Sequence, residues 1–357
     1  MRLILTFLLC IPVGGSAWSE TLRLTESHWF SPVRGLPDAP SPNSTRLNIE
    51  AEFVLDNREW FSAPVDGSTN FGWVTPLTLS YQAESAIRFE AGLVAAYDYG
   101  YRDDVDKAEP ILRLDYRPNE RHQFTFGTLY SNHQMHPALI DASRIFRTNV
   151  EQGLQYRHSG EQLLVDAWSN WQIKESDVDA EQFEVALSLE FPLRQDFQVR
   201  LMMVENHIGG QQTLDQTELR NTGFAVTLFR GVNWISTHDS LISATWISSY
   251  YDLSQGSGQV ELASGQGVEL EFETNWWLAK QWRAQWFINH YLGESQQIEH
   301  GNPLYQARNL QTLGFHTRYQ PSSPIQFELG VDFQIVDGQI NSSQVISVNW
   351  QHGTDLN

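Results

Sequence analysis

The chain has 357 residues, of which 41% are hydrophobic and 18% charged, and its formal net charge is -20 at pH 7. This acidic balance disfavours binding to nucleic acid, and the sequence contains no basic patch, glycine-rich phosphate loop or zinc-type Cys/His spacing. After the first residues no run of about 18 apolar residues occurs, which excludes a transmembrane helix.

The first residues have the composition of an export signal. A short basic start precedes the mostly apolar residues 3–13, and the small residues 15–17 suit a signal peptidase. We therefore predict a signal peptide at residues 1–17. The single cysteine, Cys10, lies inside it, so the mature chain is expected to have no thiol and no disulfide.

Residues 18–44 are predicted to form a periplasmic N-terminal extension. This stretch contains Pro32, Pro37, Pro40 and Pro42, and proline is poorly tolerated inside a strand because it lacks the backbone N–H. We therefore interpret this stretch as a periplasmic extension or linker that could contact the barrel interior.

From residue 45 onward, apolar and polar residues alternate with a period of two. Such alternation over about ten residues predicts a strand with one apolar and one polar face, long enough to cross a bilayer when tilted. The clearest example has six apolar residues at every second position: Ile325, Phe327, Leu329, Val331, Phe333 and Ile335. The same pattern recurs at residues 47–55, 87–99, 183–191 and 268–276.

The connections between these segments alternate in length. Short turns are predicted at residues 84–86, 118–121, 159–160, 192–194, 231–238, 278–280 and 321–324. Longer loops are predicted at residues 56–74, 100–109, 131–149, 174–180, 207–220, 251–266, 292–308 and 337–342. Outer-membrane barrels distribute periplasmic turns and extracellular loops in this way, which predicts an all-β, antiparallel up-and-down transmembrane barrel of about 16 strands, with 14 or 18 as alternatives.

Hairpin register predicts which residues face each other across the turns. A two-residue turn at residues 159–160 would pair Tyr156 with Leu163, and a three-residue turn at residues 278–280 would pair Trp276 with Trp282. Aromatic rings prefer the headgroup level of a membrane. We therefore predict an aromatic girdle that includes Trp276, Trp282 and Trp350.

Together these features resemble Gram-negative outer-membrane β-barrels, in particular 16-strand general porins. The resemblance rests on the leader, the alternating strands, the two classes of connection and a last strand carrying Ile346, Val348 and Trp350. It implies a barrel over residues 45–351, a C-terminal tail at residues 352–357, and a third long loop, residues 131–149, that folds inward. The pore constriction would then comprise His133, His136, Asp141, Arg144 and Arg147; a loop that only covers the mouth is the alternative.

The polar face of the predicted strands carries many charges, which a water-filled lumen tolerates and a dry core does not. Carboxylates exceed guanidinium groups among them, which favours cations; ion pairs that brace the wall are a compatible alternative. The predicted lumen wall comprises Arg88, Glu90, Arg113, Asp115, Arg117, Glu269, Glu271, Glu273, Arg283, Glu328 and Asp332.

Three short patterns carry weaker signals. His133 and His136 could bind a metal, Asp103, Asp104 and Asp106 could bind a divalent ion, and residues 238–240 (His-Asp-Ser) resemble the His-x-Ser of barrel-embedded phospholipases. Each has a simpler interpretation as a polar loop or turn. We predict no catalytic residues, no bound metal and no cofactor.

The sequence thus predicts a bacterial outer-membrane channel, not an enzyme, for passive diffusion of small polar or saccharide solutes with a mild cation preference. A plugged barrel for envelope assembly, polysaccharide export or adhesion is the alternative, and a barrel-embedded lipid hydrolase is third. The expected partners are outer-membrane lipid, lipopolysaccharide and the outer-membrane assembly machinery. A homo-oligomer is compatible with this architecture, and nucleic acid is not an expected partner.

Overall fold

The structure is a computed structural model. It describes residues 42–61, 67–99, 107–141, 150–176, 179–194, 197–209, 218–232, 238–254, 260–321 and 324–356. The predicted signal peptide and nearly all of the predicted N-terminal extension lie outside these residues. Among the residues described, no helix is long and apolar enough to cross a membrane.

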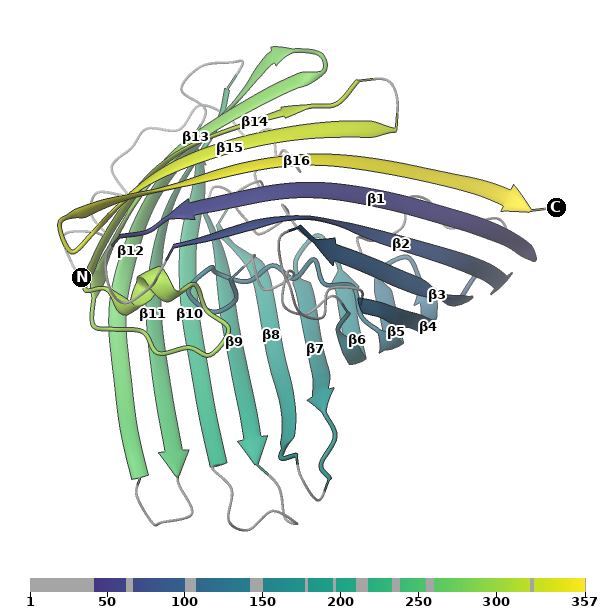
Figure 1. The fold of residues 1–357 in the computed structure, drawn as a ribbon, viewed down its shortest axis with the longest axis horizontal. Coiled ribbons are helices and arrows are strands. Elements are labelled where there is room, and N and C mark those ends of the chain that lie inside the picture. Colours follow the sequence, from purple (N-terminus) through teal and green to yellow (C-terminus); the bar gives the residue numbers. More distant parts are fainter. Residues whose placement is uncertain are drawn as a thin grey trace.

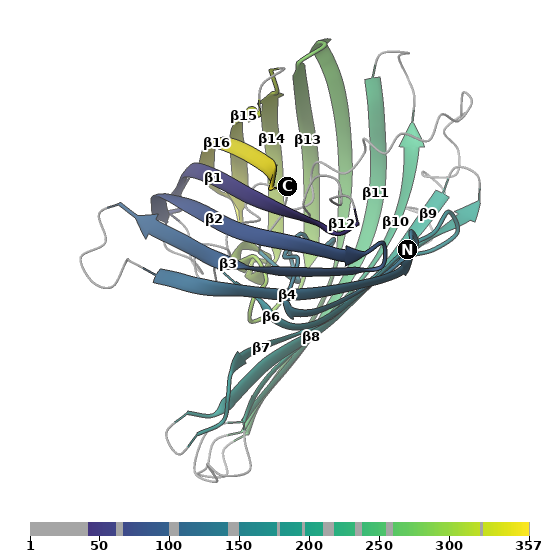
Figure 2. The same ribbon diagram turned by 90° about the vertical axis from the view of Figure 1, so that its right-hand side faces the viewer.

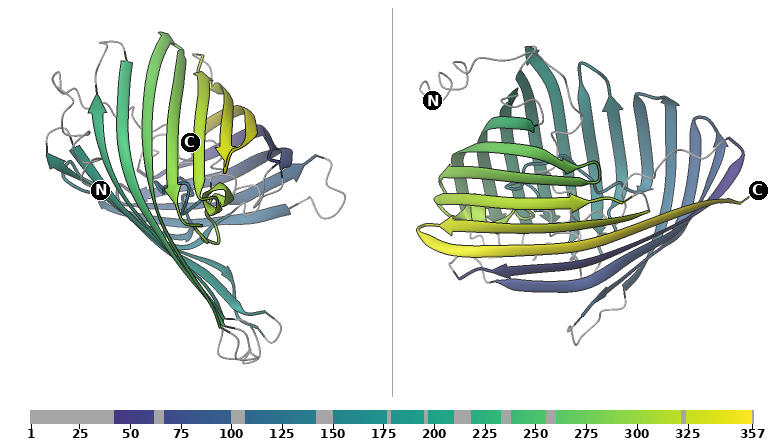
Figure 3. Two further views of the ribbon diagram at one scale, coloured as in Figure 1. Left: turned by 90° about the vertical axis from the view of Figure 1, so that its left-hand side faces the viewer. Right: turned by 90° about the horizontal axis from the view of Figure 1, so that it is seen from above.

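Sixteen antiparallel strands form one closed barrel, as predicted (Figures 1, 2 and 3). Each strand pairs with its neighbours in sequence, and β1 closes the barrel by pairing with β16, from Thr45↔Leu356 to Glu59↔Ser342. The strands are β1 Ser44–Glu59, β2 Ser68–Glu84, β3 Ile87–Asp98, β4 Lys107–Asn119, β5 His122–Thr128, β6 Gln152–Ser159, β7 Leu164–Ile173, β8 Glu181–Arg194, β9 Phe197–Gly209, β10 Glu218–Val232, β11 His238–Ser254, β12 Val260–Ala279, β13 Trp282–Gly293, β14 Asn309–Tyr319, β15 Ile325–Val336 and β16 Gln339–Leu356.

Apolar and polar residues occupy opposite faces of the wall. On β15 the outward side chains of Phe327, Leu329 and Phe333 are 43%, 41% and 52% exposed, whereas the inward Glu328 is 3% exposed. Because one face must contact lipid and the other the interior, the period-two pattern fixes which residues point each way.

Several predicted connections differ from the structure. The loop predicted at residues 337–342 is a tight Asp337–Gly338 turn, whose residues both have positive φ, 47° and 89°, as a two-residue hairpin of type I′ requires. The loop predicted at residues 251–266 is mostly strand, because β11 runs to Ser254 and β12 begins at Val260. Sequence alternation weakens toward strand ends, where both faces are polar, so long strands were underestimated.

Register differs in two predicted hairpins. Tyr156 pairs with Ala167 instead of Leu163, and Trp276 pairs with Ala284 instead of Trp282, with a bulge between Trp277 and Ala279. In both cases the shift is an even number of residues, so each side chain keeps the predicted face.

The C-terminal segment is part of the barrel. Residues 352–357 were predicted as a tail beyond a barrel at residues 45–351, but β16 continues to Leu356 and pairs with the beginning of β1. His352 lies opposite Ile49 and Thr354 opposite Leu47. The residues after Trp350 show no apolar alternation, so their pairing with β1 was not predictable from the sequence pattern.

Strands β5 and β6 are shorter than β4 and β7, the strands with which they pair on either side (Figure 1). Beyond them, residues 129–141 of the connection lie in the lumen, and its two stems still pair, with Leu129 N donating to Glu151 O at 2.8 Å. Gly127 and Gly153 face each other at the bend, and Gly127 has φ +92°. The β5–β6 hairpin therefore bends inward at a glycine pair.

A second connection, residues 294–308 between β13 and β14, packs against this inward loop. Asp141 N donates to His300 O at 2.6 Å, and Asn302 N donates to Pro137 O at 2.8 Å. Apolar side chains of both loops and of the surrounding strands form one buried cluster inside the barrel, which includes Leu129 and Met135 from the first loop and Ile298, Leu304 and Tyr305 from the second. The two loops therefore form an interior plug with its own hydrophobic core.

Candidate functional site

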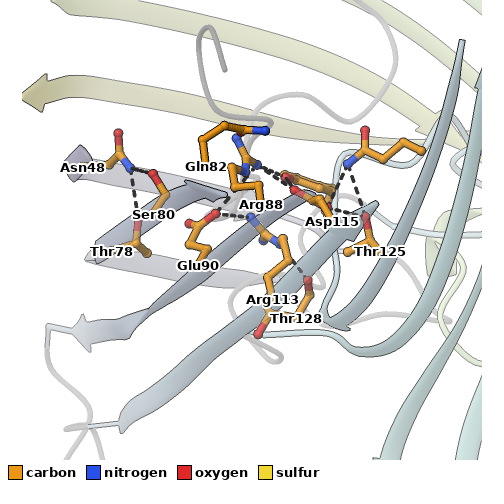
Figure 4. Close-up of polar contacts among 12 residues, drawn as sticks. Asn48, Thr78, Ser80, Gln82, Arg88, Glu90, Arg113, Asp115, Thr125 and Thr128 are labelled. Atoms are coloured by element: carbon orange, nitrogen blue, oxygen red, sulfur yellow. Dashed lines mark hydrogen bonds and ion pairs between the residues drawn. The ribbon is translucent and has the colours of Figure 1, made fainter. Parts of the chain in front are cut away.

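The inward loop is held at its base by a charged network on β3, β4 and β5 (Figure 4). Arg88 Nη2 lies 2.8 Å from Asp115 Oδ2, and Arg113 Nη1 lies 3.1 Å from Glu90 Oε2. Arg113 also donates to the backbone carbonyls of Thr128 and Leu129, at 2.8 and 3.2 Å. Because these charges are paired and bind the loop backbone, the network braces the loop instead of lining open water.

Tyr130, the second residue of the inward loop, completes this network. Its hydroxyl donates to Asp115 Oδ2 at 2.6 Å, and its ring lies 3.9 Å from the guanidinium carbon of Arg113. Burial raises the pKa of the Tyr130 phenol, so it remains protonated at neutral pH.

His133 joins the inward loop to β7. Its Nε2 lies 2.8 Å from Glu151 Oε2, its Nδ1 lies 3.1 Å from Asp166 Oδ2, and its ring stacks on Trp168 with centroids 3.5 Å apart. Burial alone would lower the pKa of His133, but the two carboxylates raise it to about 9. His133 is therefore an imidazolium at neutral pH, and both of its nitrogens are engaged.

His136 lies further along the same loop and contacts β12. Its Nε2 lies 3.1 Å from Glu269 Oε1, and its Nδ1 accepts the backbone N–H of Ala138 at 3.2 Å. The other Glu269 oxygen accepts the hydroxyl of Tyr305 at 2.6 Å, and burial raises the pKa of that phenol well above its ordinary value. His136 therefore links the two inward loops, and neither nitrogen is available to a substrate.

His300, in the second inward loop, has a different arrangement. Its Nδ1 lies 2.9 Å from Glu184 Oε2 on β8, and the Glu184 side chain is fully buried whereas that of His300 is 24% exposed. Trp168 Nε1 donates to the other Glu184 oxygen at 3.2 Å. With Nδ1–H directed at the carboxylate, neutral His300 has its lone pair on Nε2, and no described residue forms a hydrogen bond with that atom.

The backbone around His300 is fixed from two sides. Asn221 on β10 accepts the Glu299 N–H at 2.7 Å and donates to Gln297 O at 2.6 Å. Gly301 approaches Ala138 so closely that an added Cβ would lie 2.1 Å from its carbonyl oxygen. The imidazole is therefore held by a rigid support, as a general base requires.

The remaining predicted site residues are dispersed. Asp141 accepts Arg58 Nη1 at 3.3 Å, whereas Arg144 and Arg147 lie outside the described residues. Glu273 accepts hydrogen bonds from the side-chain amides of Asn275 and Gln285. Glu271, which lies between Glu269 and Glu273 in the sequence, is half-buried. The guanidinium group of Arg283 lies over the ring of Trp277. Glu328 forms an ion pair with Arg318, and Asp332 contacts His316. Arg117 is half-buried near the β4–β5 turn.

The three predicted girdle residues, Trp276, Trp282 and Trp350, lie on the outer face of the barrel, at the tight-turn end.

The weaker motifs do not form sites in the described part of the chain. No group of three or more His, Cys, Asp or Glu residues there could hold a metal, and His133 and His136 contact different carboxylates. Ser240 donates to Thr274 at 2.9 Å, at the tight-turn end. Asp103, Asp104 and Asp106 lie outside the described residues.

A closed barrel with an apolar outer face and a charged interior defines an outer-membrane β-barrel of bacteria. Two solved structures of OmpT of Vibrio cholerae share the fold. The loop L8 deletion mutant has 11% identity and a TM-score of 0.53, covering 87% of this chain and 100% of that chain. In-vitro folded OmpT has 12% identity and a TM-score of 0.52, covering 88% and 99%. No curated protein matches the chain significantly.

The family profile of the Lipid A 3'-O-deacylase type matches residues 38–356, so the chain belongs to this family. The prediction that the chain is not an enzyme is therefore wrong, because the family is named for an enzymatic activity. The alternation at residues 183–191 puts Glu184 on the polar face of a strand, but the sequence predicted no role for Glu184 or His300. The two residues are 116 positions apart, so no local spacing could have joined them.

Proposed function

We propose that this barrel is an outer-membrane acyl-ester hydrolase and that its substrate is a lipid A-type glycolipid. The observation that carries this proposal is the Glu184–His300 pair, in which a buried carboxylate orients an imidazole at 2.9 Å and leaves Nε2 available. The family match over residues 38–356 supports the choice of substrate.

The chemistry requires only a water molecule and this pair. A water oxygen attacks the ester carbonyl while His300 Nε2 takes its proton, which forms a tetrahedral intermediate and an imidazolium stabilised by Glu184. The intermediate then collapses, the bond to the sugar oxygen breaks, and His300 returns the proton to that oxygen. The products are a free fatty acid and a sugar hydroxyl.

Release of fatty acid from purified lipopolysaccharide by the refolded protein tests this function. We expect the wild-type barrel to release acyl chains, and a folded barrel without measurable release would contradict the proposal. The conservative His300→Gln variant should lose the activity, because glutamine fills the site but cannot accept the proton.

A diffusion channel is the second candidate, favoured by the excess of carboxylates on the inner face of β12, namely Glu269, Glu271 and Glu273. The plug weighs against it, because Glu269 binds both inward loops and Glu273 is fully buried. Single-channel recording separates the two. A channel should conduct, and deletion of residues 135–145 should raise its conductance.

A further inference from the structure

Two histidines face each other on the outer side of β5 and β6, the two shortest strands of the barrel. His122 begins β5 and lies directly opposite His158, near the end of β6. Because side chains alternate along a strand, they share the outward side with Phe126 and Leu154, which are 45% and 54% exposed. The turns that border the pair, at residues 119–122 and 159–164, lie within the described part of the chain, at the tight-turn end of the barrel.

The separation of the two imidazole rings suits a shared metal ion. Their centroids lie 4.6 Å apart, with the ring planes tilted by 43°. Two imidazoles that bind one ion through nitrogen, at a metal–nitrogen distance of about 2.0–2.1 Å, have centroids roughly 4.5–5 Å apart. The backbone pairing of β5 with β6 holds the two side chains at this spacing. The hairpin therefore presents a cross-strand pair of nitrogen ligands.

The nitrogen atoms of the pair are suited to this role. His122 Nδ1 lies 2.9 Å from the hydroxyl of Tyr156, and in the tautomer that donates Nδ1–H to this hydroxyl the lone pair is on Nε2. A histidine that binds a metal usually donates its other ring N–H to such a fixed acceptor. His158 Nδ1 is buried and has no hydrogen-bond partner among the described residues. The ring of His158 lies against Gly160, where an added Cβ would be 2.7 Å from Nε2, so this turn position leaves room for the imidazole.

Aromatic packing alone does not explain two imidazoles at this position. At the next outward position of the same strands, Phe124 lies opposite Tyr156, and their rings pack with centroids 4.9 Å apart. Carbon rings therefore fill the cross-strand site there without any buried nitrogen. A buried polar atom without a partner destabilises a fold, so the unpartnered nitrogen of His158 calls for a ligand.

We infer that His122 and His158 form a binding site for a divalent transition metal ion of the class of Zn²⁺ or Cu²⁺, with water molecules as the remaining ligands. Imidazole nitrogen favours these ions, whereas Ca²⁺ and Mg²⁺ favour oxygen ligands. The ion joins β5 to β6 on the outer face, at the end of the barrel that is periplasmic in outer-membrane proteins. Because Glu184 and His300 lie inside the barrel, this inference does not depend on the proposed function.

Isothermal titration of the untagged, refolded barrel in detergent at neutral pH tests the site with ZnCl₂, CuCl₂ and CaCl₂. We expect one equivalent of Zn²⁺ at this site, tighter binding of Cu²⁺, and no binding of Ca²⁺ there. His158→Phe keeps an aromatic ring but has no nitrogen, so it should abolish this equivalent of Zn²⁺. His352→Gln is the matched control, because it removes another imidazole from the tight-turn end, one that is exposed and contacts Thr354.

Two further measurements separate metal binding from a structural role of the histidines. Tyr156→Phe removes only the acceptor of His122 Nδ1–H and should weaken Zn²⁺ binding by about 10- to 100-fold. X-ray absorption of the Zn²⁺-loaded wild type should show two imidazole nitrogens at about 2.0–2.1 Å, a result that does not depend on the folding of any variant. Absence of Zn²⁺ binding by the folded wild type, unchanged binding by folded His158→Phe, or an equal loss in His352→Gln would overturn the inference.

Discussion

Gly127 on β5 lies directly opposite Gly153 on β6, at the point where the hairpin leaves the wall and enters the lumen. A Cβ at Gly127 would lie 2.1 Å from Leu112 O, and one at Gly153 would lie 1.9 Å from Ser169 O. Both neighbours are backbone atoms of adjacent strands and cannot rotate away. The bend that places the inward loop therefore depends on the absence of two side chains.

We predict that Gly153→Ala destabilises the barrel by about 1–3 kcal/mol, the usual cost of overpacking. Equilibrium unfolding in guanidinium chloride, followed by tryptophan fluorescence in detergent, measures the change. Gly338→Ala is the matched control, since Gly338 also has positive φ, +89°, but nothing lies within 4 Å of its added Cβ. Equal losses of unfolding free energy in the two variants would show that the backbone conformation, and not crowding at the bend, is the reason for glycine at residue 153.

The outer face of β15 is predicted to tolerate no charge. Leu329→Arg should reduce the free energy of unfolding by about 2–4 kcal/mol if this residue lies near the bilayer midplane. Asp332→Asn on the inner face retains a hydrogen-bond acceptor for His316 and should have a much smaller effect. Similar folding free energies for both variants in lipid vesicles would contradict the assignment of faces.

The attachment of the inward loop should weaken at alkaline pH. The pKa of His133 is raised to about 9 from its ordinary value of 6.5, so the protonated form stabilises the fold. This contribution is complete below about pH 6.5 and is lost as pH rises through about 9.

Hydrogen exchange of residues 129–141, corrected for the intrinsic effect of pH, should therefore become faster between pH 7 and pH 10 in the wild type. His133→Gln removes the imidazolium that bridges Glu151 and Asp166, so its exchange should be fast throughout, with no step near pH 9. A step of the same size in the variant would assign the effect to another group.

Most of the barrel was predictable from sequence because a membrane wall imposes a simple rule on each strand. Residues such as Phe327 and Leu329 must face lipid while Glu328 faces inward, and this alternation gave the all-β class and the strand number. At strand ends and in turns, the alternation of apolar and polar residues is less strict, so the sequence predicts their bounds less well. The dipeptide Asp337–Gly338 is typical of a two-residue hairpin turn, but a long loop was predicted there instead.

The interior was less predictable because it depends on contacts between distant segments. For the third loop, entry into the lumen and a cover over the mouth were both predicted, and its residues 131–141 lie in the lumen. The second inward loop, residues 294–308, which packs against it, was treated only as an external loop. Charged residues such as Arg113 and Glu90 were interpreted as the lining of a water channel, whereas they pair with each other and bind the loop backbone. Alternation identifies an inward side chain but does not reveal what covers it.

The central claim is that Glu184 and His300 cleave an acyl ester of lipid A, and the mass spectrum of lipid A from cells that express the protein tests it most directly. Wild-type protein should produce lipid A lacking one ester-linked acyl chain, and His300→Ala should reduce this product by roughly 10²- to 10⁴-fold, the usual contribution of a general base. His316→Gln, which alters another imidazole near a carboxylate at 2.9 Å, should leave the product unchanged. Full-length lipid A in cells with folded wild-type barrel, or undiminished cleavage by folded His300→Ala, would contradict the claim.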